Sequence, residues 1–510
     1  MRSTKAARGT LYLTIQQVIQ YLAAFIFYAS VARFITQTEV GLWSILMATT
    51  AVFTTLTLLG LPVATQKYVS ENHGRGDLRE AASISRLSFT IVALATLPIL
   101  TMILLLSSPL STLILEGTEH TIPLILVLGA SAILNFTALY GAEMLGLGMY
   151  LEVAVQNLAF ILVSKATGLV LAYLWHGLIG LAMGWMIGSL VCLMLSIHLM
   201  RDKLPRPSSH IRDLFGPVFR YSYPVWILAM IALAQGWVDI TILYALTGRA
   251  ALTGIYYLAT AGATILAVFW AAISMIMLPL MSSQEARLGK QALPVIYNTS
   301  SRLLNIMILP IGAGLAAISP TAITIAYGSG YLEGSIPFAL LTATAIFPAY
   351  VAINTSTLQA IAETKVLAKI GAISAIIDIV LVTILVKPLG ANGAALARMA
   401  MYMSAFFLTQ KALASETQIK IDQSHFTMTM TLAAMVALPL ATLDYALTYM
   451  SPINTIARFI LEGISFLFVY IISLRLFGIV RREDFELLRK ALPGQFGAIL
   501  NMLEGFVIRH

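Results

Sequence analysis

The feature that most constrains this chain is a set of glycines repeated at a constant offset of 213 residues. The pairs fall after the first apolar stretch of each half, in the loops after the second and third, and at the start of the sixth. Such a duplication is typical of secondary transporters, whose two halves place a substrate site near the bilayer midplane. The five pairs are Gly41 with Gly254, Gly76 with Gly289, Gly117 with Gly330, Gly177 with Gly390, and Gly180 with Gly393.

Fourteen apolar stretches approach the length of about 20 residues that crosses a hydrocarbon core of about 30 Å. Composition agrees, because 59% of residues are hydrophobic, 11% are charged and the mean hydropathy is +0.87. The first stretch is too long for a signal-peptide core, so we expect it to remain a membrane helix. We place the spans near residues 9–35, 40–65, 84–107, 121–146, 153–175, 177–200, 223–247, 254–283, 302–326, 336–360, 366–387, 391–413, 426–447 and 455–477.

The sequence therefore predicts an all-α polytopic membrane protein with 14 transmembrane helices. Two six-helix lobes related by the internal repeat are followed by a C-terminal helix pair outside the repeat. The expected parts are an N-lobe (1–200), a cytoplasmic inter-lobe linker (201–222), a C-lobe (223–413), an accessory helix pair (414–477) and a cytoplasmic amphipathic tail (478–510).

Orientation follows from the positive charges, because short cytoplasmic loops retain lysine and arginine. Most of the 31 such residues fall in the terminal tails and the even-numbered connections, and only Arg33, Arg249, Lys387 and Arg458 fall at the opposite face. Both termini are thus predicted to be cytoplasmic. This distribution explains the net charge of +8 by topology and contact with anionic lipid headgroups, so we do not expect nucleic acid as a partner.

Motifs for catalysis or cofactor binding are lacking in the sequence. It has no phosphate-binding Gly-rich loop, its seven histidines are scattered, and Cys192 is its single cysteine. A glycosyltransferase or ligase needs a sizeable polar loop, and no predicted loop qualifies. We expect no catalytic residue, no metal site and no cofactor; a membrane enzyme or ligase of glycan assembly is the alternative.

Charged residues inside predicted spans are the main candidate site residues, because such charges tend to face a cavity or a partner. Lys165 and Asp378 are 213 residues apart, so they occupy equivalent places in the two lobes. One interpretation is that Lys165 contacts an anionic substrate and Asp378 a coupling cation. The other is local neutralisation: Arg398 lies at a similar depth to Asp378 across a short hairpin, whereas Lys165 has no obvious partner.

Asp239 is a second acidic residue well inside the bilayer, near Gln235 and Trp237 in the span that begins the second half. We predict that Asp239 binds a proton or sodium ion and that Trp237 contacts substrate. The alternative for Asp239 is a salt bridge with Arg33, which lies near the outer end of the equivalent first span.

Polar residues also follow one face of the first span, where Tyr12, Gln16 and Gln20 recur every four residues. Such a stripe should face protein or water rather than lipid. Gln16 and Gln20 are candidates for contact with a sugar, and hydrogen bonding between helices is the alternative.

Three other charged residues have structural interpretations. Glu143, toward the cytoplasmic end of the fourth span, is expected at the membrane interface. Arg458 and Glu462 are four residues apart in the last span and are expected to form a pair. The accessory helix pair is expected to shape a groove that is open to lipid.

Several short segments resemble the N-terminal signature of polysaccharide flippases of the Wzx type, which belong to the superfamily of MATE multidrug exporters and lipid II flippases. A further likeness precedes the twelfth span, and a weaker one lies in the tail. The segments are Val31-Ala32-Arg33-Phe34, Val40-Gly41-Leu42-Trp43, Leu59-Gly60-Leu61, Tyr68-Val69-Ser70-Glu71, Gly76-Asp77-Leu78, Pro388-Leu389-Gly390-Ala391-Asn392-Gly393-Ala394-Ala395 and Arg481-Arg482-Glu483-Asp484.

This resemblance implies alternating access around a central cavity in the cell membrane, with a polyprenyl-linked oligosaccharide as cargo. It implies basic residues near the cargo phosphates, a role that by position falls on Lys165, Arg33 or Arg398. Besides membrane lipids, it leaves open a coupling sodium ion or proton and glycan assembly enzymes as partners. A MATE-like cation-coupled exporter is the alternative, although the first span lacks the acidic residue that some of those exporters carry there.

Overall fold

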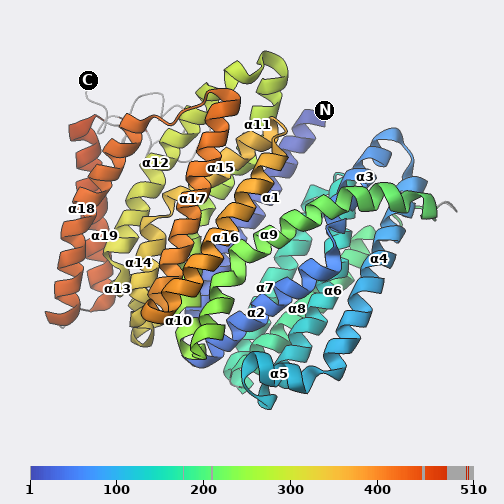
Figure 1. Ribbon diagram of the computed structural model, residues 1–510, viewed down its shortest axis with the longest axis horizontal. Coiled ribbons are helices and arrows are strands. Elements are labelled where there is room, and N and C mark those ends of the chain that lie inside the picture. The colour runs from blue at the N-terminus through green and yellow to red at the C-terminus, as the bar shows by residue number, and fades with distance from the viewer. Residues whose placement is uncertain are drawn as a thin grey trace. The chain divides into compact units, whose positions relative to one another are not determined.

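The computed structural model describes residues 2–175, 177–207, 211–450, 454–478, 501 and 504, and within these residues the secondary structure is helical without a strand (Figure 1). Most of the predicted tail, 478–510, lies outside the described residues. The chain is a multi-pass membrane protein: twelve helices are long and apolar enough to span a membrane, or thirteen with one bent pair included.

The helices in the first half of the chain are α1 (Arg2–Val31), α2 (Gln37–Leu58), α3 (Leu61–Arg75), α4 (Leu78–Leu105), α5 (Ser107–Leu115), α6 (Thr121–Gly146), α7 (Tyr150–Trp175), α8 (Leu178–Met200), α9 (Phe215–Thr247) and α10 (Ala250–Ala263). Those that follow are α11 (Ala267–Leu288), α12 (Leu293–Ala317), α13 (Ser319–Tyr327), α14 (Ser335–Ala343), α15 (Ile346–Ala360), α16 (Thr364–Leu389), α17 (Ala391–Thr417), α18 (Gln423–Met450) and α19 (Thr455–Phe477).

The predicted all-α polytopic fold is confirmed, but the count of fourteen spans is not. Every predicted span overlaps a helix or a helix pair. The tenth corresponds to the bent pair Ser329–Ala343 and Ile346–Ala360, whose parts meet at 40°. The twelfth corresponds to α17, which carries Arg398, Lys411 and Glu416 and is not among the helices apolar enough to count as a span.

Some predicted boundaries were wrong, since local backbone geometry interrupts the apolar runs. The second predicted span, 40–65, is divided between α2 and α3 by Leu59 and Gly60, which both have positive φ angles (50° and 72°) and so cannot continue a right-handed helix. Conversely, α4 begins at Leu78, before the predicted span 84–107, because the side chain of Asp77 accepts a hydrogen bond from the backbone N–H of Glu80.

Two of the five repeated glycine pairs have the same structural role in the two halves. Gly177 and Gly390 precede α8 and α17 with positive φ angles of 94° and 53°. Three residues later, an added Cβ would lie 2.3 Å from the backbone N of Ala172 at Gly180, and 2.2 Å from the backbone O of Leu385 at Gly393. Both glycines therefore allow the close packing of a helical hairpin, α7 with α8 and α16 with α17.

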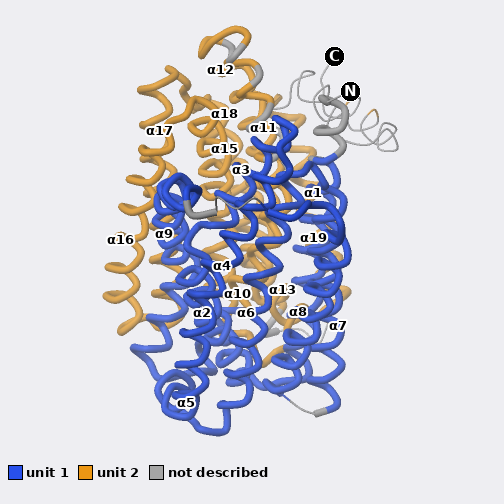
Figure 2. The backbone as a smooth tube through the Cα atoms, turned by 90° about the vertical axis from the view of Figure 1, so that its right-hand side faces the viewer, with its two compact units in different colours: residues 1–257 blue, residues 258–510 orange. Residues whose placement is uncertain are grey.

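Contacts within the chain define two compact units, residues 1–257 and 258–510 (Figure 2). The first includes α9, whose Trp226 donates from Nε1 to the backbone O of Thr55 in α2 at 2.8 Å. These units group the helices that pack together, whereas the predicted lobes follow the repeat. The lobe boundaries at 201–222 therefore stay a prediction.

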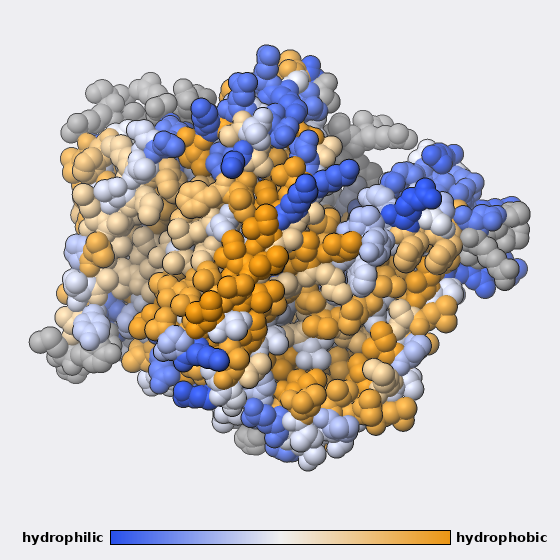
Figure 3. All heavy atoms as spheres, in the orientation of Figure 1, coloured by the Kyte–Doolittle hydropathy of each residue, from blue (hydrophilic) through white to orange (hydrophobic). Residues whose placement is uncertain are grey.

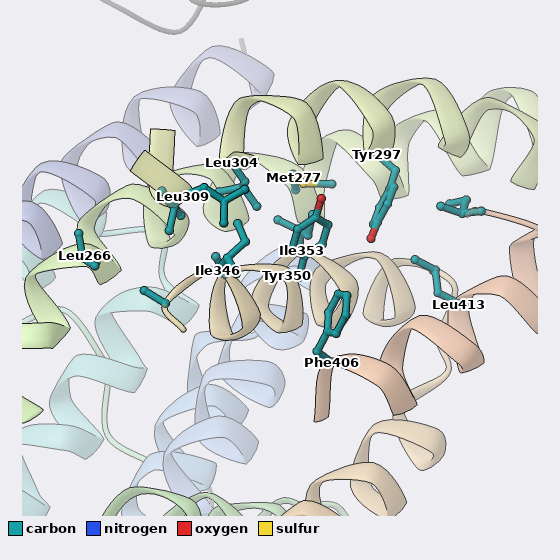
Figure 4. Close-up of a cluster of buried hydrophobic side chains, with 14 of the residues drawn as sticks. Leu266, Met277, Tyr297, Leu304, Leu309, Ile346, Tyr350, Ile353, Phe406 and Leu413 are labelled. Carbon is teal, nitrogen blue, oxygen red and sulfur yellow. The ribbon is translucent and has the colours of Figure 1, made fainter. Parts of the chain in front are cut away.

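The core of the second unit is a cluster of buried apolar side chains from α11, α12, α15 and α17 (Figure 4). Two buried tyrosines are anchored through their hydroxyl groups. Tyr297 donates to Asn354 Oδ1 at 2.7 Å, and Tyr350 donates to Asn305 Oδ1 at 2.9 Å. These bonds satisfy polar groups that would otherwise be costly to bury.

On the face seen in Figure 3, hydrophobic side chains cover the middle parts of the helices, whereas hydrophilic ones gather toward their ends. Many of the apolar side chains are well exposed, among them Leu94, Leu438 and Ile464 at 71%, 67% and 61%. Lipid is the medium that covers such surfaces in a membrane protein.

Candidate functional site

Lys165 is the centre of the candidate site in the first unit. It lies on α7, half-buried, and its Nζ stands 4.4 Å from the ring centroid of Phe27 and 5.1 Å from that of Tyr28, both on α1. Within the described residues Lys165 makes no ion pair. The ammonium group therefore lies against aromatic faces, and no carboxylate of the described residues competes with an incoming anion for it.

Two more aromatic residues extend this arrangement. The hydroxyl groups of Tyr28 and Tyr257 are hydrogen-bonded at 2.5 Å, and Trp237 on α9 stacks on the Tyr257 ring with centroids 6.4 Å apart. We call Lys165, Phe27, Tyr28, Tyr257 and Trp237 the Lys165 cluster. It joins α1, α7, α9 and α10, and it combines one cation with four rings, two of which carry hydroxyl groups.

Sequence reasoning selected Lys165 and Trp237 but missed the three rings between them. The chain contains 22 phenylalanines and 20 tyrosines, and no sequence signal distinguishes Phe27, Tyr28 and Tyr257 from the others. Only the packing of α1 against α7, and of α9 beside α10, brings them together.

Asp239 lies on α9, two residues beyond Trp237, and its side chain is fully buried. Its carboxylate accepts a hydrogen bond from the hydroxyl group of Tyr256 and a second from the backbone N–H of Ile240 at 2.8 Å. A buried carboxylate of this kind is chemically suited to binding a proton or a small cation.

The polar face of α1 is satisfied partly within the helix itself. Gln16 is buried, and its Nε2 donates to Oε1 of the exposed Gln20 at 2.9 Å. The alternative for the polar stripe of Tyr12, Gln16 and Gln20 was hydrogen bonding between helices, whereas this bond lies within α1. Arg33 lies beyond the end of α1 and is exposed.

Asp378 and Arg398 belong to the second unit, on the neighbouring helices α16 and α17. Both side chains are buried, with 1% and 8% of their surface exposed. Their burial on two helices that pack as a hairpin is compatible with the predicted pair and with a coupling role, and both interpretations stay predictions.

The expected pair of Arg458 and Glu462 is confirmed on α19, with 3.9 Å between Nε and Oε1. It belongs to a larger buried group that the sequence did not indicate. Asp444 of α18 lies 3.7 Å from the Arg458 Nε, and Thr321 of α13 bonds both Asp444 and Arg458. This group fastens the accessory helices α18 and α19 to α13.

Glu143 was expected at the membrane interface; its depth stays a prediction, but its side chain is covered by protein. Only 2% of its surface is exposed, and its Oε1 accepts a hydrogen bond from the hydroxyl group of Ser85 on α4. The position was judged by depth alone, and the packing of α6 against α4 covers the side chain.

An apolar groove of about 410 Å³ runs between α18 and α19. Exposed side chains such as Met435 and Leu443 on α18 and Phe477 on α19 form part of its wall. A groove along the accessory helices was expected, and this one is suited to an alkyl or prenyl chain. Among the described residues no three His, Cys, Asp or Glu side chains are arranged to hold a metal ion.

The sequence is similar to a family model and to a curated protein. The family model described as Polysaccharide biosynthesis protein matches residues 6–285. A curated protein, stage V sporulation protein B of Bacillus subtilis (strain 168), is 31% identical over 120 residues. That match covers 24% of this chain and 23% of the length of that relative, so the chain spans less than a quarter of the relative it matches.

Solved structures share the fold over most of the chain. The lipid II flippase MurJ in an inward closed conformation gives a TM-score of 0.72 at 16% identity, covering 92% of this chain and 98% of that chain. An inward-facing multidrug resistance MATE family transporter of the MOP superfamily gives 0.63 at 13% identity, covering 80% and 98%. These neighbours are a flippase and a transporter rather than enzymes.

Proposed function

Because the chain belongs to the polysaccharide biosynthesis protein family, we propose that it is a flippase for lipid-linked oligosaccharides. The cargo is an oligosaccharide on a polyprenyl phosphate or diphosphate, which moves from the cytoplasmic to the outer leaflet of the cell membrane by alternating access. Both termini are cytoplasmic in this proposal. The fold shared with a lipid II flippase supports it.

The observation that carries the proposal is the Lys165 cluster. A lipid-linked oligosaccharide combines a phosphate anion with hydroxyl-rich rings, and the cluster offers an ammonium group beside aromatic faces and tyrosine hydroxyl groups. The cation has no carboxylate partner in the described residues, so a phosphate has no competitor for it there. Gln16 and Gln20 of α1 supply further polar groups for sugar contact, and Arg33 and Arg398 are the other candidates for the phosphates.

The groove between α18 and α19 supports the lipid part of the cargo. Its wall is almost entirely apolar, and several of the side chains in it are well exposed, Met435 and Phe477 among them. Apolar burial gives about 0.8 kcal/mol for each CH₂ group. A prenyl or acyl chain is thus the kind of ligand that this groove of the second unit suits.

Energy for directional transport enters, in this proposal, through Asp239 and Asp378 as sites for a proton or a sodium ion. The burial of both carboxylates supports this role. Glycan assembly enzymes that supply or consume the cargo are the expected partners.

A MATE-like cation-coupled exporter is the second candidate, and the structural likeness to a multidrug resistance transporter favours it. The aromatic rings around Lys165 suit flat apolar drugs, but the uncompensated cation disfavours the cationic ones. A drug exporter therefore predicts transport that does not depend on the charge of Lys165.

The test is the amount and sidedness of lipid-linked oligosaccharides in cells that lack the gene and carry variants of it. Without the gene, the lipid should accumulate in the cytoplasmic leaflet. Lys165→Met, which keeps the side-chain length but removes the charge, should fail to relieve the accumulation, whereas Lys165→Arg should relieve it in part.

Equal amounts of each variant in the membrane, measured by immunoblot, are the control. Unchanged lipid-linked oligosaccharides combined with new sensitivity to drugs in the gene-deficient cells would reject the flippase and support the exporter.

A further inference from the structure

A second cavity lies in the first unit, separate from the Lys165 cluster. It has a volume of about 300 Å³, is lined by residues of α3, α6, α7 and α8, and is open to the outside of the unit. Val63, Leu134 and Phe160 make its walls mainly apolar, and Gln156, Asn157 and Cys192 also line it. Among the described residues that line this cavity there is no lysine, arginine, aspartate or glutamate.

Gln156 places an unused hydrogen-bond acceptor in the wall. Only 3% of the residue is exposed, and its Nε2 donates to the backbone O of Thr137 at 2.8 Å and to Ser196 Oγ at 2.9 Å. A carbonyl oxygen only accepts, so the amide nitrogen must face Thr137 and the amide oxygen must point the other way. Within the described residues, Oε1 of Gln156 accepts no hydrogen bond.

Gly141 on α6 keeps this oxygen uncovered. A Cβ added at Gly141 would lie 3.2 Å from Gln156 Oε1, so any side chain there would shield the acceptor. The amide of Asn157, next to Gln156 in the wall, also makes no hydrogen bond in the described part of the chain. A buried acceptor without a donor is unfavourable, and a ligand with a donor group relieves that cost.

We propose that this cavity binds an uncharged hydroxyl group carried on an apolar body. The hydroxyl donates to Gln156 Oε1 beside Gly141, and the apolar body contacts Val63, Leu134 and Phe160. The absence of charged residues from the lining excludes ionic groups, because nothing there compensates a buried charge. Two molecules supply this chemistry: a sugar on a glycolipid, and the glycerol of a neutral membrane lipid.

The site is independent of the proposed substrate contact at Lys165. Gln156 and Lys165 are nine residues apart on α7, which corresponds to about 14 Å along the helix and to opposite faces of it. Failure of the flippase assay would therefore leave this proposal standing, and the reverse also holds.

The single cysteine of the chain gives a direct test, since Cys192 lines the cavity and 3% of it is exposed. In nanodiscs, the full-length protein is reacted with a membrane-permeant maleimide, with hexyl β-D-glucoside, 1-monohexanoylglycerol or hexyl sulfate present. We expect the glucoside, the glycerol ester or both to slow the labelling of Cys192 at least threefold, and the charged sulfate with the same chain to leave it unchanged. Protection by the glucoside alone assigns the site to sugars, and protection by the ester alone assigns it to lipid glycerol.

Gly141→Ala is the decisive variant, because it covers the acceptor without removing either hydrogen bond that Gln156 donates. It should abolish the protection. Gly129→Ala on the same helix is the matched control, since among the described residues its Cβ meets only the movable methyl end of Met186, at 3.0 Å, and it should keep the protection.

Equal protection in Gly141→Ala, equal protection by hexyl sulfate, or no protection by either hydroxylated ligand would overturn the proposal. If Cys192 does not react in the ligand-free protein, the rise in unfolding temperature on ligand binding replaces labelling as the measurement. A rise with the hydroxylated ligands that Gly141→Ala abolishes supports the proposal, and an equal rise in that variant or with hexyl sulfate overturns it.

Discussion

At the scale of single residues, the environment of Lys165 does not fully offset the cost of its charge. A cation over aromatic rings gains about 0.5 to 2 kcal/mol, whereas a charge at the middle of a membrane helix costs at least about 2.5 to 3.5 kcal/mol. The Phe27 and Tyr28 rings thus hold the ammonium group in place, and the remaining stabilisation is left to water or to an anionic ligand.

Asp239 gives the first prediction. Asp239→Asn preserves the shape of a side chain that accepts a hydrogen bond from Tyr256 but removes the charge on which the proposed coupling to a proton or sodium ion depends. We expect the initial rate of ion-driven transport to fall at least about tenfold, equivalent to about 1.4 kcal/mol, with little change in unfolding temperature. Transport in vesicles with and without an ion gradient measures this. A rate that still responds fully to the gradient, in Asp239→Asn and in the double variant with Asp378→Asn, would contradict ion coupling at these residues.

The residues that the sequence revealed are those whose polarity conflicts with an apolar surrounding. Lys165 and Asp239 stood out because charge inside a span has few explanations. Phe27, Tyr28 and Tyr257 did not, since an aromatic residue in a membrane helix has many. The burial of Glu143 and the contact of Asp444 with Arg458 depend on which helices meet, which no single span reveals.

At the scale of helices, repeated glycines determine how closely two hairpins pack. In Gly393→Val, the new Cβ would lie 2.2 Å from the backbone O of Leu385. This distance is too short, so the backbones of α16 and α17 must separate. Overpacking of this kind costs about 1 to 3 kcal/mol, and we expect a clear fall in the unfolding temperature of the purified protein.

The matched control is Gly463→Val on α19, where, outside the helix's own backbone, no atom of the described residues lies within 4 Å of an added Cβ. It carries the same change in helix propensity without the backbone clash. An equal loss of stability in the two variants would show that propensity rather than close packing explains the repeated glycine.

The accessory helices depend on a buried ionic group. Arg458→Met leaves the carboxylates of Asp444 and Glu462 buried without their cation, and removal of one partner from such a group costs about 3 to 5 kcal/mol. We expect a marked loss of stability by denaturant titration. Combining Arg458→Met with Asp444→Asn and Glu462→Gln should recover much of it, and a triple variant as unstable as the single one would argue against this electrostatic explanation.

Helix existence was predictable from apolar runs, and helix boundaries were less so. The break at Leu59 and Gly60 depends on two consecutive positive φ angles, of which only the glycine is a recognisable signal. The capping of α4 by Asp77 moved its start several residues before the apolar run, because hydrophobicity marks the membrane-spanning part of a helix and not its ends.

At the scale of the whole molecule, the fold class followed from the length and hydropathy of the apolar runs, which the lipid surroundings impose, and from the internal repeat. The number of spans did not follow as firmly. α17 is a 27-residue helix but carries several charged residues and is not apolar enough to count as a span, and α14 and α15 form one bent span. The lobes proposed from the repeat and the units that pack together divide the chain at different places, since repetition reflects ancestry and contact reflects packing.

Orientation is testable with single cysteines in a Cys192→Ser background. Ser415→Cys, at the exposed end of α17, is predicted to face the cytoplasm, and Ser108→Cys, exposed at the start of α5, to face outward. In intact cells a membrane-impermeant maleimide should label only the cysteine at 108. After the membrane is opened, it should label the cysteines at both positions. Labelling of 415 but not 108 in intact cells would invert the topology and with it the direction of transport.

The central claim is that this chain moves a lipid-linked oligosaccharide across a bilayer with Lys165 at the headgroup. The most direct measurement is transbilayer movement of a fluorescent polyprenyl diphosphate oligosaccharide in liposomes containing the purified protein, followed by an impermeant quencher. We predict rapid loss of fluorescence from both leaflets with the wild-type protein, slow loss with Lys165→Met, and intermediate loss with Lys165→Arg. Movement no faster than in empty liposomes, or equally fast with Lys165→Met, would contradict the account.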